Sequence, residues 1–334
     1  MIDCKNKITH WNFFDNSKTC TGAGRYEYEI FKHLSELPNI DMQKTHIPHS
    51  IFNALYSDIK TYNANIIHAT YQELAPLKLI KHPKNFVLTV LDIIPSSQFS
   101  IFKKLKRFWY LTEMSIQYAD KIIAISEYTK HELVNRLGID KDKITVVPLG
   151  VKYYYKPYDK QACRAIFNMD NDKKYILIVS SNAPWKNMKV ANEIINRLHD
   201  EYQFIKIGYG EYLNNPYVIN LGNVPEHRMP LLYNACDLFL HTSKYEGFGL
   251  PILEAMACGC PVISSNATAL PEVVKDVGML VPPDNVNLFV DMIDYILHND
   301  DLYNTMKRRG INNASRFTWK RTAIETLAVY DTLV

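Results

Sequence analysis

The chain has 334 residues, of which 47% are hydrophobic and 22% charged, and its net charge at neutral pH is +3. This length suits two domains of ~150 residues each, and the composition excludes a disordered or collagen-like chain. Apolar runs such as residues 175–179 are far shorter than the ~20 residues of a membrane span. Since residues 1–11 hold no apolar signal core, we expect a cytoplasmic protein.

The six cysteines form no CxxC pair, so we expect neither a disulfide framework nor a zinc site. Charge is distributed unevenly along the chain. Residues 1–155 are basic on balance and residues 156–334 are slightly acidic, which predicts different partners for the two halves.

The first half alternates short apolar runs with helical patterns. Strands are predicted at residues 64–70, 85–92, 120–126 and 142–150. A helix is predicted over residues 127–138, because Ser126 is a good N-cap and Gly138 a good helix end.

One stretch of the first half, residues 100–114, predicts a basic amphipathic helix. Its two sides hold basic residues (Lys103, Lys104, Lys106, Arg107) and apolar residues (Ile101, Phe102, Leu105, Phe108, Trp109). Such a helix can lie on an anionic membrane. The alternative is an ordinary helix with its apolar side in the core and its lysines in water. Nucleic acid is not an expected partner, because the basic surface is one short helix.

The second half repeats the alternating scheme. Strands are predicted at 174–181, 203–208, 217–222, 237–243 and 261–265, and helices at 188–198, 227–236 and 250–259, followed by a terminal helix. Continuous apolar strands alternating with helices predict parallel sheets covered on both faces. We therefore predict an α/β protein of two doubly wound domains joined near residues 151–160. Ligands of such sheets bind at the carboxyl ends of the strands, here in a cleft between the domains.

The segment YEGFGLPILEAMACGCPV, residues 245–262, has the strongest chemical pattern. It places Glu246 in a glycine-rich loop after a strand, and Glu254 about one turn into the following helix. Free amides at a helix start favour an anion, and glycines let a ligand approach the backbone. Phosphates on the amides and hydroxyls on the carboxylates suit a sugar nucleotide. On spacing alone, a capping carboxylate plus a surface glutamate is an equal alternative.

Other ligand motifs are missing from the sequence. Residues 22–24 (GAG) lack the third glycine of a dinucleotide fingerprint, and no EF-hand loop, HExxH or Walker lysine motif occurs. We therefore predict no metal and no cofactor.

The Glu246–Glu254 string and the residues after it resemble the E-x7-E signature of retaining glycosyltransferases of the family 4 type, which have the GT-B fold. Further segments resemble that family in the same order: 21–34, 87–95, 119–133, 144–151, 184–187, 221–224 and 317–323. The resemblance implies two Rossmann-like domains facing across a cleft. Residues 1–155 would bind the acceptor and 156–315 the nucleotide-sugar, and the helix in 316–334 would cross back to the first domain.

The resemblance also implies roles in donor binding. Glu254 would hold the ribose hydroxyls, and Glu246 with the following amides would hold the donor sugar and the diphosphate. Lys186 would stabilise charge on the leaving group. The other implied donor contacts are the amides of Gly247, Phe248, Gly249 and Leu250, then Asn187 beside the lysine and Val224 near the base.

In the first domain, Gly22 and Gly24 would let a loop close on the diphosphate. Arg25 would begin the helix behind it, or would be an ordinary surface arginine. Asp92 would orient the acceptor hydroxyl, with a strand-end capping role as an equal alternative.

Two positions depart from the family pattern. Trp185 replaces the usual arginine before the lysine, which removes one phosphate cation that Arg25 or another basic residue would have to replace. Leu91 replaces a histidine that contacts the donor sugar in relatives, which suggests a 6-deoxy sugar or pentose as donor. His68 is a candidate replacement for that imidazole, although a plain strand-end histidine is the simpler interpretation.

The expected activity is transfer of a sugar, with retention, from a UDP- or GDP-sugar to a glycan or lipid-linked acceptor. Surface polysaccharide or glycolipid synthesis at the inner face of the membrane is the expected context. The alternatives are a catalytically impaired nucleotide-sugar-binding partner subunit, suggested by Trp185 and Leu91, and a GT-B epimerase or phosphorylase.

Overall fold

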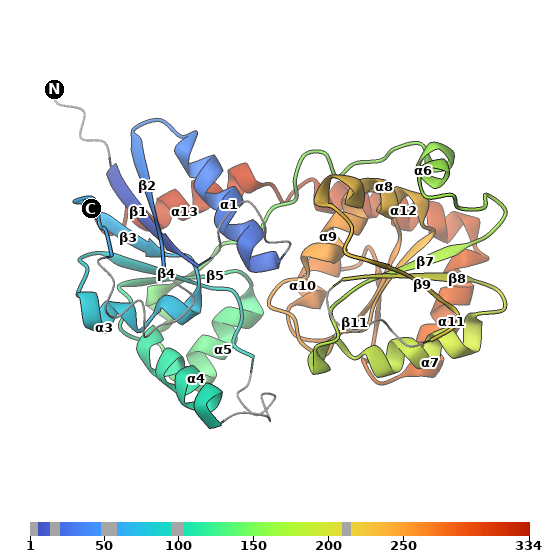
Figure 1. The fold of residues 1–334 in the computed structure, drawn as a ribbon, viewed down its shortest axis with the longest axis horizontal. Coiled ribbons are helices and arrows are strands. Elements are labelled where there is room, and N and C mark those ends of the chain that lie inside the picture. The colour runs from blue at the N-terminus through green and yellow to red at the C-terminus, as the bar shows by residue number, and fades with distance from the viewer. Residues whose placement is uncertain (1–5, 14–20, 48–58, 95–102, 209–214) are drawn as a thin grey trace. The chain divides into compact units, whose positions relative to one another are not determined.

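The computed structural model describes residues 6–13, 21–47, 59–94, 103–208 and 215–334, with side chains of the helix at 103–116 described from Trp109 onward. The chain divides into two compact units (Figure 1). Unit 1 comprises Met1–Gly150 with Trp319–Val334, and unit 2 comprises Val151–Thr318. The boundaries expected from the sequence followed residues 155 and 315.

Unit 1 is built on a six-stranded sheet with the order β2-β1-β3-β4-β5-β6, in which all neighbours are parallel. The strands are β1 (Asn6–Asn12), β2 (Ile40–His46), β3 (Ile66–Ala69), β4 (Phe86–Val90), β5 (Lys121–Ala124) and β6 (Ile144–Val146). The sequence analysis missed β1 and β2. Polar residues interrupt the apolar pattern of β1, and β2 is an edge strand with only partly buried side chains.

Helices cover both faces of this sheet. They are α1 (Gly22–Ser35), α3 (Leu77–Lys81), α4 (Lys103–Ile116), α5 (Glu127–Leu137) and α13 (Trp319–Tyr330). Figure 1 shows α1 and α13 on one face and the other three on the opposite face. The prediction for α5 is confirmed, since the Ser126 hydroxyl accepts from the Thr129 amide and Gly138 ends the helix at φ +66°.

The helix α1 begins three residues earlier than Arg25, where the sequence placed its start. The side chain of Thr21 accepts a hydrogen bond from the Gly24 amide and so caps the helix at Gly22. Gly22 and Gly24 therefore lie in the first turn of α1.

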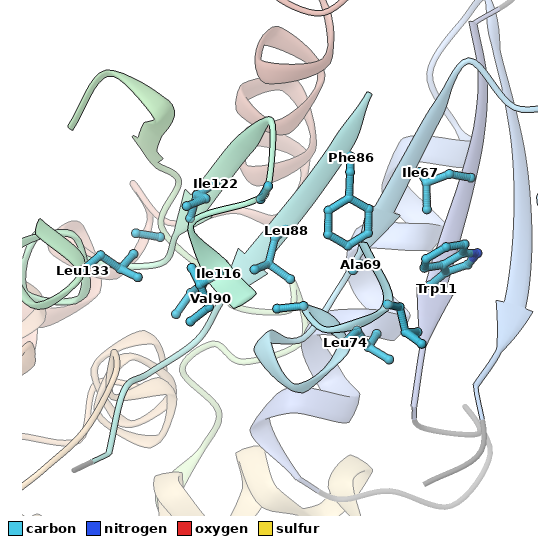
Figure 2. Packing of buried hydrophobic residues seen from close by; sticks show 14 of the residues in the cluster. Trp11, Ile67, Ala69, Leu74, Phe86, Leu88, Val90, Ile116, Ile122 and Leu133 are labelled. Carbon is cyan, nitrogen blue, oxygen red and sulfur yellow. The ribbon is translucent and has the colours of Figure 1, made fainter. Parts of the chain in front are cut away.

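A buried apolar cluster of unit 1 lies between the sheet and the helices α4 and α5. Trp11 of β1 and Phe86 and Leu88 of β4 lie in one buried cluster with Ile116 of α4 and Leu133 of α5 (Figure 2). Burial of each such side chain contributes about 1.5–3 kcal/mol, so this cluster fixes the strands whose carboxyl ends lead into the site loops.

Unit 2 has a second six-stranded parallel sheet, with the order β12-β11-β10-β7-β8-β9. The strands are β7 (Tyr175–Val179), β8 (Gln203–Ile207), β9 (Val218–Gly222), β10 (Leu238–His241), β11 (Val262–Ser265) and β12 (Met279–Val281). The chain order reverses between β7 and β10, which are neighbours in the centre of the sheet. The prediction of two doubly wound α/β domains is thus confirmed.

The helices of unit 2 are α6 (Lys160–Ile166), α7 (Met188–Leu198), α8 (Met229–Ala235), α9 (Leu250–Ala257), α10 (Leu270–Val274), α11 (Val286–Leu297) and α12 (Asp300–Ala314). Figure 1 shows α7 and α11 on one face of the sheet, and α8, α9 and α12 on the other. The bounds of α7 match those predicted. The sequence analysis expected a single helix after β11, but α10, β12, α11 and α12 come before α13.

Within the described segments, none of the helices combines the length and apolar character needed to cross a bilayer. In the same segments, four cysteines are free and buried, namely Cys163, Cys236, Cys258 and Cys260. Cys4 and Cys20 lie outside the described residues.

Candidate active site

The candidate site of unit 2 lies where β7 and β10 end side by side. The chain leaves β7 through residues 180–187, which include the 3₁₀ turn η4 (Pro184–Lys186), and leaves β10 through residues 242–249. In open parallel sheets, the point where strand order reverses opens a crevice at the carboxyl ends of the strands. The two loops therefore border the position expected for a ligand.

Glu246 is the charged centre of this site. Its Oε1 accepts hydrogen bonds from Lys186 Nζ at 2.6 Å and from His241 Nε2 at 2.9 Å. Its backbone is also held, because its amide donates to Thr268 Oγ1 and the Thr268 hydroxyl donates to its carbonyl, both at 2.9 Å. The loop thus presents the carboxylate in one fixed position.

Electrostatics keep Glu246 ionised. Burial alone would raise the pKa of this carboxyl, but the Lys186 charge and the His241 hydrogen bond outweigh it and hold the pKa well below its usual range. A carboxylate with this environment accepts hydrogen bonds from hydroxyl groups at any physiological pH.

The start of α9 follows directly after Glu246. Gly249 has φ +111°, and a Cβ there would lie 2.9 Å from Leu270 Cδ2, so only glycine fits. Phe248 is buried and packs edge-to-face against Phe317, with ring centroids 5.9 Å apart, which holds the loop in place. Pro251 has no N–H and the Ile252 amide donates to the Gly249 carbonyl at 3.0 Å, so the amides that border the anion-binding position expected at this helix start are those of Gly247, Gly249 and Leu250.

Glu254 lies one turn further along α9 and is only 3% exposed. Its Oε2 accepts a hydrogen bond from the Tyr233 hydroxyl of α8 at 3.1 Å. The structure therefore places the two glutamates of the sequence motif on one loop–helix segment, with the helix start between them.

The loop after β7 is tied to this segment. Asn187 has φ +57° where η4 passes into α7, and its Nδ2 donates to the Pro283 carbonyl at 2.8 Å. Half-buried Trp185 accepts at its carbonyl from the Lys244 amide at 2.7 Å. Val224, also half-buried, follows β9 at the same edge of the sheet.

The site residues expected in unit 1 fall into separate places. Gly22, Gly24 and half-buried Arg25 lie in the first turn of α1, and no atom would lie within 4 Å of a Cβ at Gly22. Leu91 and Asp92 follow β4 at the carboxyl edge of the sheet.

Gln72, in the 3₁₀ turn η1 (Gln72–Leu74), joins these edge residues. It accepts from the Leu91 amide at 3.1 Å and donates to Asp92 Oδ1 at 3.4 Å. Burial and then the Asp92 charge raise the pKa of neighbouring Glu73 to about 7. Beside Asp92, this edge therefore holds a carboxyl group that is readily protonated.

His68 lies in the core of unit 1 and has no exposed surface. Its Nδ1 lies 2.6 Å from the Tyr330 hydroxyl and its Nε2 lies 2.8 Å from Thr89 Oγ1. Both ring nitrogens have partners inside the protein, so a sugar contact would require one of these hydrogen bonds to break.

The sequence analysis missed His241, Thr268, Tyr233 and Glu73. Only His241 had a signal in the sequence, since it is a titratable residue at the end of an apolar strand, five positions before Glu246. The others come from separate elements, and their partners are visible only in the folded structure.

Both units match known families. Residues 159–313 match the family described as "Glycosyl transferases group 1", and residues 19–153 match the one described as "Glycosyltransferase Family 4".

Curated relatives share about two thirds of the chain. Identity to O-antigen chain mannosyltransferase B of Escherichia coli is 30% over 237 residues, which cover 66% of this chain and 62% of that protein. Identity to the serotype-specific mannosyltransferase WbdA of the same species is 26% over 239 residues, covering 65% and 29%. D-inositol 3-phosphate glycosyltransferase of Mycolicibacterium smegmatis is 28% identical over 233 residues, covering 64% and 53%. The alignments thus span less than two thirds of each relative.

Solved structures share the fold over nearly the whole chain. Sucrose-phosphate synthase from Thermosynechococcus elongatus gives a TM-score of 0.81 at 18% identity, covering 98% of this chain and 99% of that one. HepE of Anabaena, in complex with UDP and glucose, gives a TM-score of 0.78 at 18% identity, covering 98% of this chain and 99% of that one.

Proposed function

Because the chain belongs to the glycosyltransferases of the family 4 type and has their GT-B fold, we propose that it transfers a sugar, with retention, from a nucleotide-sugar to a glycan or lipid-linked acceptor. One observation carries this proposal most directly. Glu246, ion-paired with Lys186, stands at the start of α9, and buried Glu254 lies one turn along the same helix.

The geometry suits a bound nucleoside diphosphate sugar. Glu254 offers a carboxylate to the ribose hydroxyls, and the amides of the loop before α9 and of Leu250 offer donors to the diphosphate. Lys186 carries the positive charge that stabilises the leaving diphosphate, since opposite charges attract strongly in a site with little water. Val224 lies at the edge where the base would fit, and Asn187 fixes the turn that carries the lysine.

The reaction requires one bond to form and one to break at the anomeric carbon. The bond from that carbon to the diphosphate oxygen breaks, and the acceptor oxygen bonds to the same face of the sugar. The acceptor proton passes to the leaving diphosphate, so no protein nucleophile is needed. Glu246 would hold a sugar hydroxyl during this step, and Asp92 would orient the acceptor.

The donor sugar is the finer part of the proposal. Two relatives from Escherichia coli are mannosyltransferases, which supports a donor that carries mannose, whereas the HepE complex holds UDP and glucose. Leu91, buried at the end of β4, favours a sugar with an apolar group near the outer hydroxyl, such as a 6-deoxy sugar. A hexose with an intact 6-hydroxyl as the best donor would contradict the deoxy-sugar proposal.

Surface features of α4 support a membrane-bound acceptor. Tyr110, Leu111, Met114 and the following Tyr118 are exposed apolar or aromatic residues, and α4 begins with a run of lysines and one arginine. Aromatic side chains beside basic ones suit the anionic surface of a membrane. We propose that α4 rests there while unit 1 receives a lipid-linked acceptor, as in surface polysaccharide synthesis.

A thermal-shift panel tests the donor site. Wild type and Glu254→Ala are each heated with UDP-, GDP-, ADP- and dTDP-sugars, because a ligand of the folded state raises the melting temperature. We expect one nucleotide to stabilise the wild type, to lose its effect in the variant and to be released slowly by hydrolysis. Stabilisation without any turnover, even with acceptors present, would favour the partner-subunit alternative.

A further inference from the structure

His241 is the last residue of β10 and only 3% of its surface is exposed. Its ring lies against Phe239, with centroids 5.8 Å apart, and its backbone pairs with Ser264 of β11. From this fixed position its Nε2 reaches Glu246 Oε1 at 2.9 Å. A hydrogen bond to a carboxylate requires a donor, so Nε2 carries the proton.

Glu246 Oε1 therefore receives two hydrogen bonds, one from His241 and one from Lys186. Within the described residues, no further side chain bonds to the carboxylate. Both hydrogen bonds go to Oε1 and fix the orientation of the carboxylate, so Oε2 remains available for a ligand hydroxyl.

The two donors to Oε1 differ in what else they do. Lys186 has three N–H donors and, in the proposed function, must also hold the diphosphate. His241 has no such second task, because its ring is buried against Phe239 and its Nε2 bonds to Glu246. It supplies a hydrogen bond that stays in place while the ammonium group of Lys186 turns toward the phosphates.

We infer that His241 is a positioning residue for the transfer reaction, acting through Glu246. Its Nε2–H keeps Oε1 turned inward, so that Oε2 faces the donor sugar when Lys186 engages the diphosphate. This inference rests on the proposed function of Glu246 as the carboxylate that holds the donor sugar.

Three substitutions separate positioning from packing. His241→Gln places an amide N–H near the position of Nε2, whereas the shorter His241→Asn cannot reach Glu246, and His241→Leu has no donor. We expect kcat to fall about 10- to 100-fold in the Leu and Asn variants, with donor KM changed less than threefold. His241→Gln should recover kcat to within about fivefold of wild type.

The nucleotide alone provides the matched control. In the proposed function, nucleoside diphosphate binds through Glu254, Lys186 and the amides before α9 and not through the Glu246 carboxylate, so its Kd should be equal in wild type and in His241→Leu. Wild-type kcat in His241→Leu, or a Gln variant no faster than the Asn variant at equal melting temperature, would overturn the inference.

A turnover-independent measurement keeps this inference separate from the proposed function. Two-bond ¹⁵N–¹H NMR of the imidazole reports which nitrogen carries the proton, and we expect Nε2 in wild type with a shifted resonance in Glu246→Gln. A proton on Nδ1 alone would refute the inference even in an active enzyme. An Nε2 proton in a protein that turns over no nucleotide-sugar would uphold the hydrogen bond and refute the proposed function.

Discussion

Units 1 and 2 each bury a histidine in a strand of a six-stranded parallel sheet, and the two histidines serve different ends. His68 on β3 lies between Tyr330 and Thr89, whereas His241 at the end of β10 bonds to Glu246. The difference lies in the partner. The hydroxyl partners of His68 make it part of the core of unit 1. The carboxylate partner of His241 connects it to the loop at the carboxyl ends of the strands, where we propose that the donor binds.

The unit 1 histidine belongs to a buried polar network that fastens the last helix. The Tyr330 hydroxyl of α13 contacts His68 Nδ1 at 2.6 Å and His10 Nε2 at 3.2 Å. Thr89 continues the network to the Tyr26 hydroxyl of α1 at 2.8 Å. Since buried polar groups are costly when unpaired, this network selects one position of α13 on the sheet of unit 1.

The largest effect on activity should come from a substitution at the carboxyl edge of the unit 2 sheet, where β7 and β10 end. Lys186→Met removes the charge proposed to stabilise the leaving diphosphate, so we expect kcat to fall about 10²- to 10³-fold. Lys244→Met is the matched control, because Lys244 lies in the adjoining loop after β10 and its ammonium group pairs with exposed Asp284. Initial-rate kinetics of both variants check this. Equal losses of kcat in the two variants would show that the charge of Lys186 has no special role in the site.

The histidines of unit 1 should make stability depend on pH. Burial lowers the pKa of His68 to about 3 and also lowers that of His10, so the unfolded chain binds more protons below pH ~6.5. The free energy of unfolding should therefore decrease as pH falls from ~6.5 toward 3, by up to about 1.4 kcal/mol per pH unit for each histidine.

Urea unfolding at pH 7 and pH 5.5 measures this slope. His68→Leu should reduce it, because one of the two buried histidines no longer titrates. The same pH dependence in wild type and variant would show that other groups dominate.

Tyr330→Phe tests the network without changing the shape of α13. It leaves two imidazole nitrogens without a hydroxyl partner, which should lower the free energy of unfolding by about 1–3 kcal/mol. Tyr295→Phe on α11 is the control, since that side chain is 53% exposed and should change stability by less than ~0.5 kcal/mol. Denaturant midpoints that do not differ between the two variants would argue against the network.

A smaller effect is expected where a tyrosine supports Glu254, the carboxylate proposed to bind the ribose. Tyr233→Phe removes the hydroxyl that donates to Glu254, so donor KM should rise about three- to tenfold with little change in kcat. Steady-state kinetics with the preferred donor measure both constants. An unchanged KM would mean that Glu254 needs no such support.

The smallest effect concerns α4. Replacing Tyr110 and Met114 by serine removes exposed apolar surface, so binding to vesicles with anionic lipid should weaken several-fold. Co-sedimentation measures this, with Tyr295→Ser on α11 as the control. Equal binding of the double variant and wild type would contradict the proposal that α4 rests on a membrane.

The sequence predicted unit 2 better than unit 1 for physical reasons. Strands such as β7 are continuously apolar, and the Glu246–Glu254 spacing fixes two carboxylates on one loop and helix. In unit 1, polar residues interrupt β1, and one of them, His10, has its hydrogen-bond partner Tyr330 on α13 at the far end of the chain. Periodicity cannot show such distant hydrogen bonds, so the strand was missed and His68 was considered for a sugar contact.

The same reasoning explains why His241 was missed. A titratable residue at the end of an apolar strand is a signal, but the direction of the His241 ring depends on packing against Phe239 and on the fold of the following loop. Its importance follows only from the distance to Glu246.

The most direct test of the central claim is the anomeric configuration of a product formed from a nucleotide-sugar. The protein is incubated with the donor that stabilises it and a small alcohol as acceptor, and the glycoside is analysed by ¹H NMR. We predict the anomeric configuration of the donor in the product, and no product from Glu254→Ala. An inverted glycoside, or equal product from wild type and variant, would contradict the account.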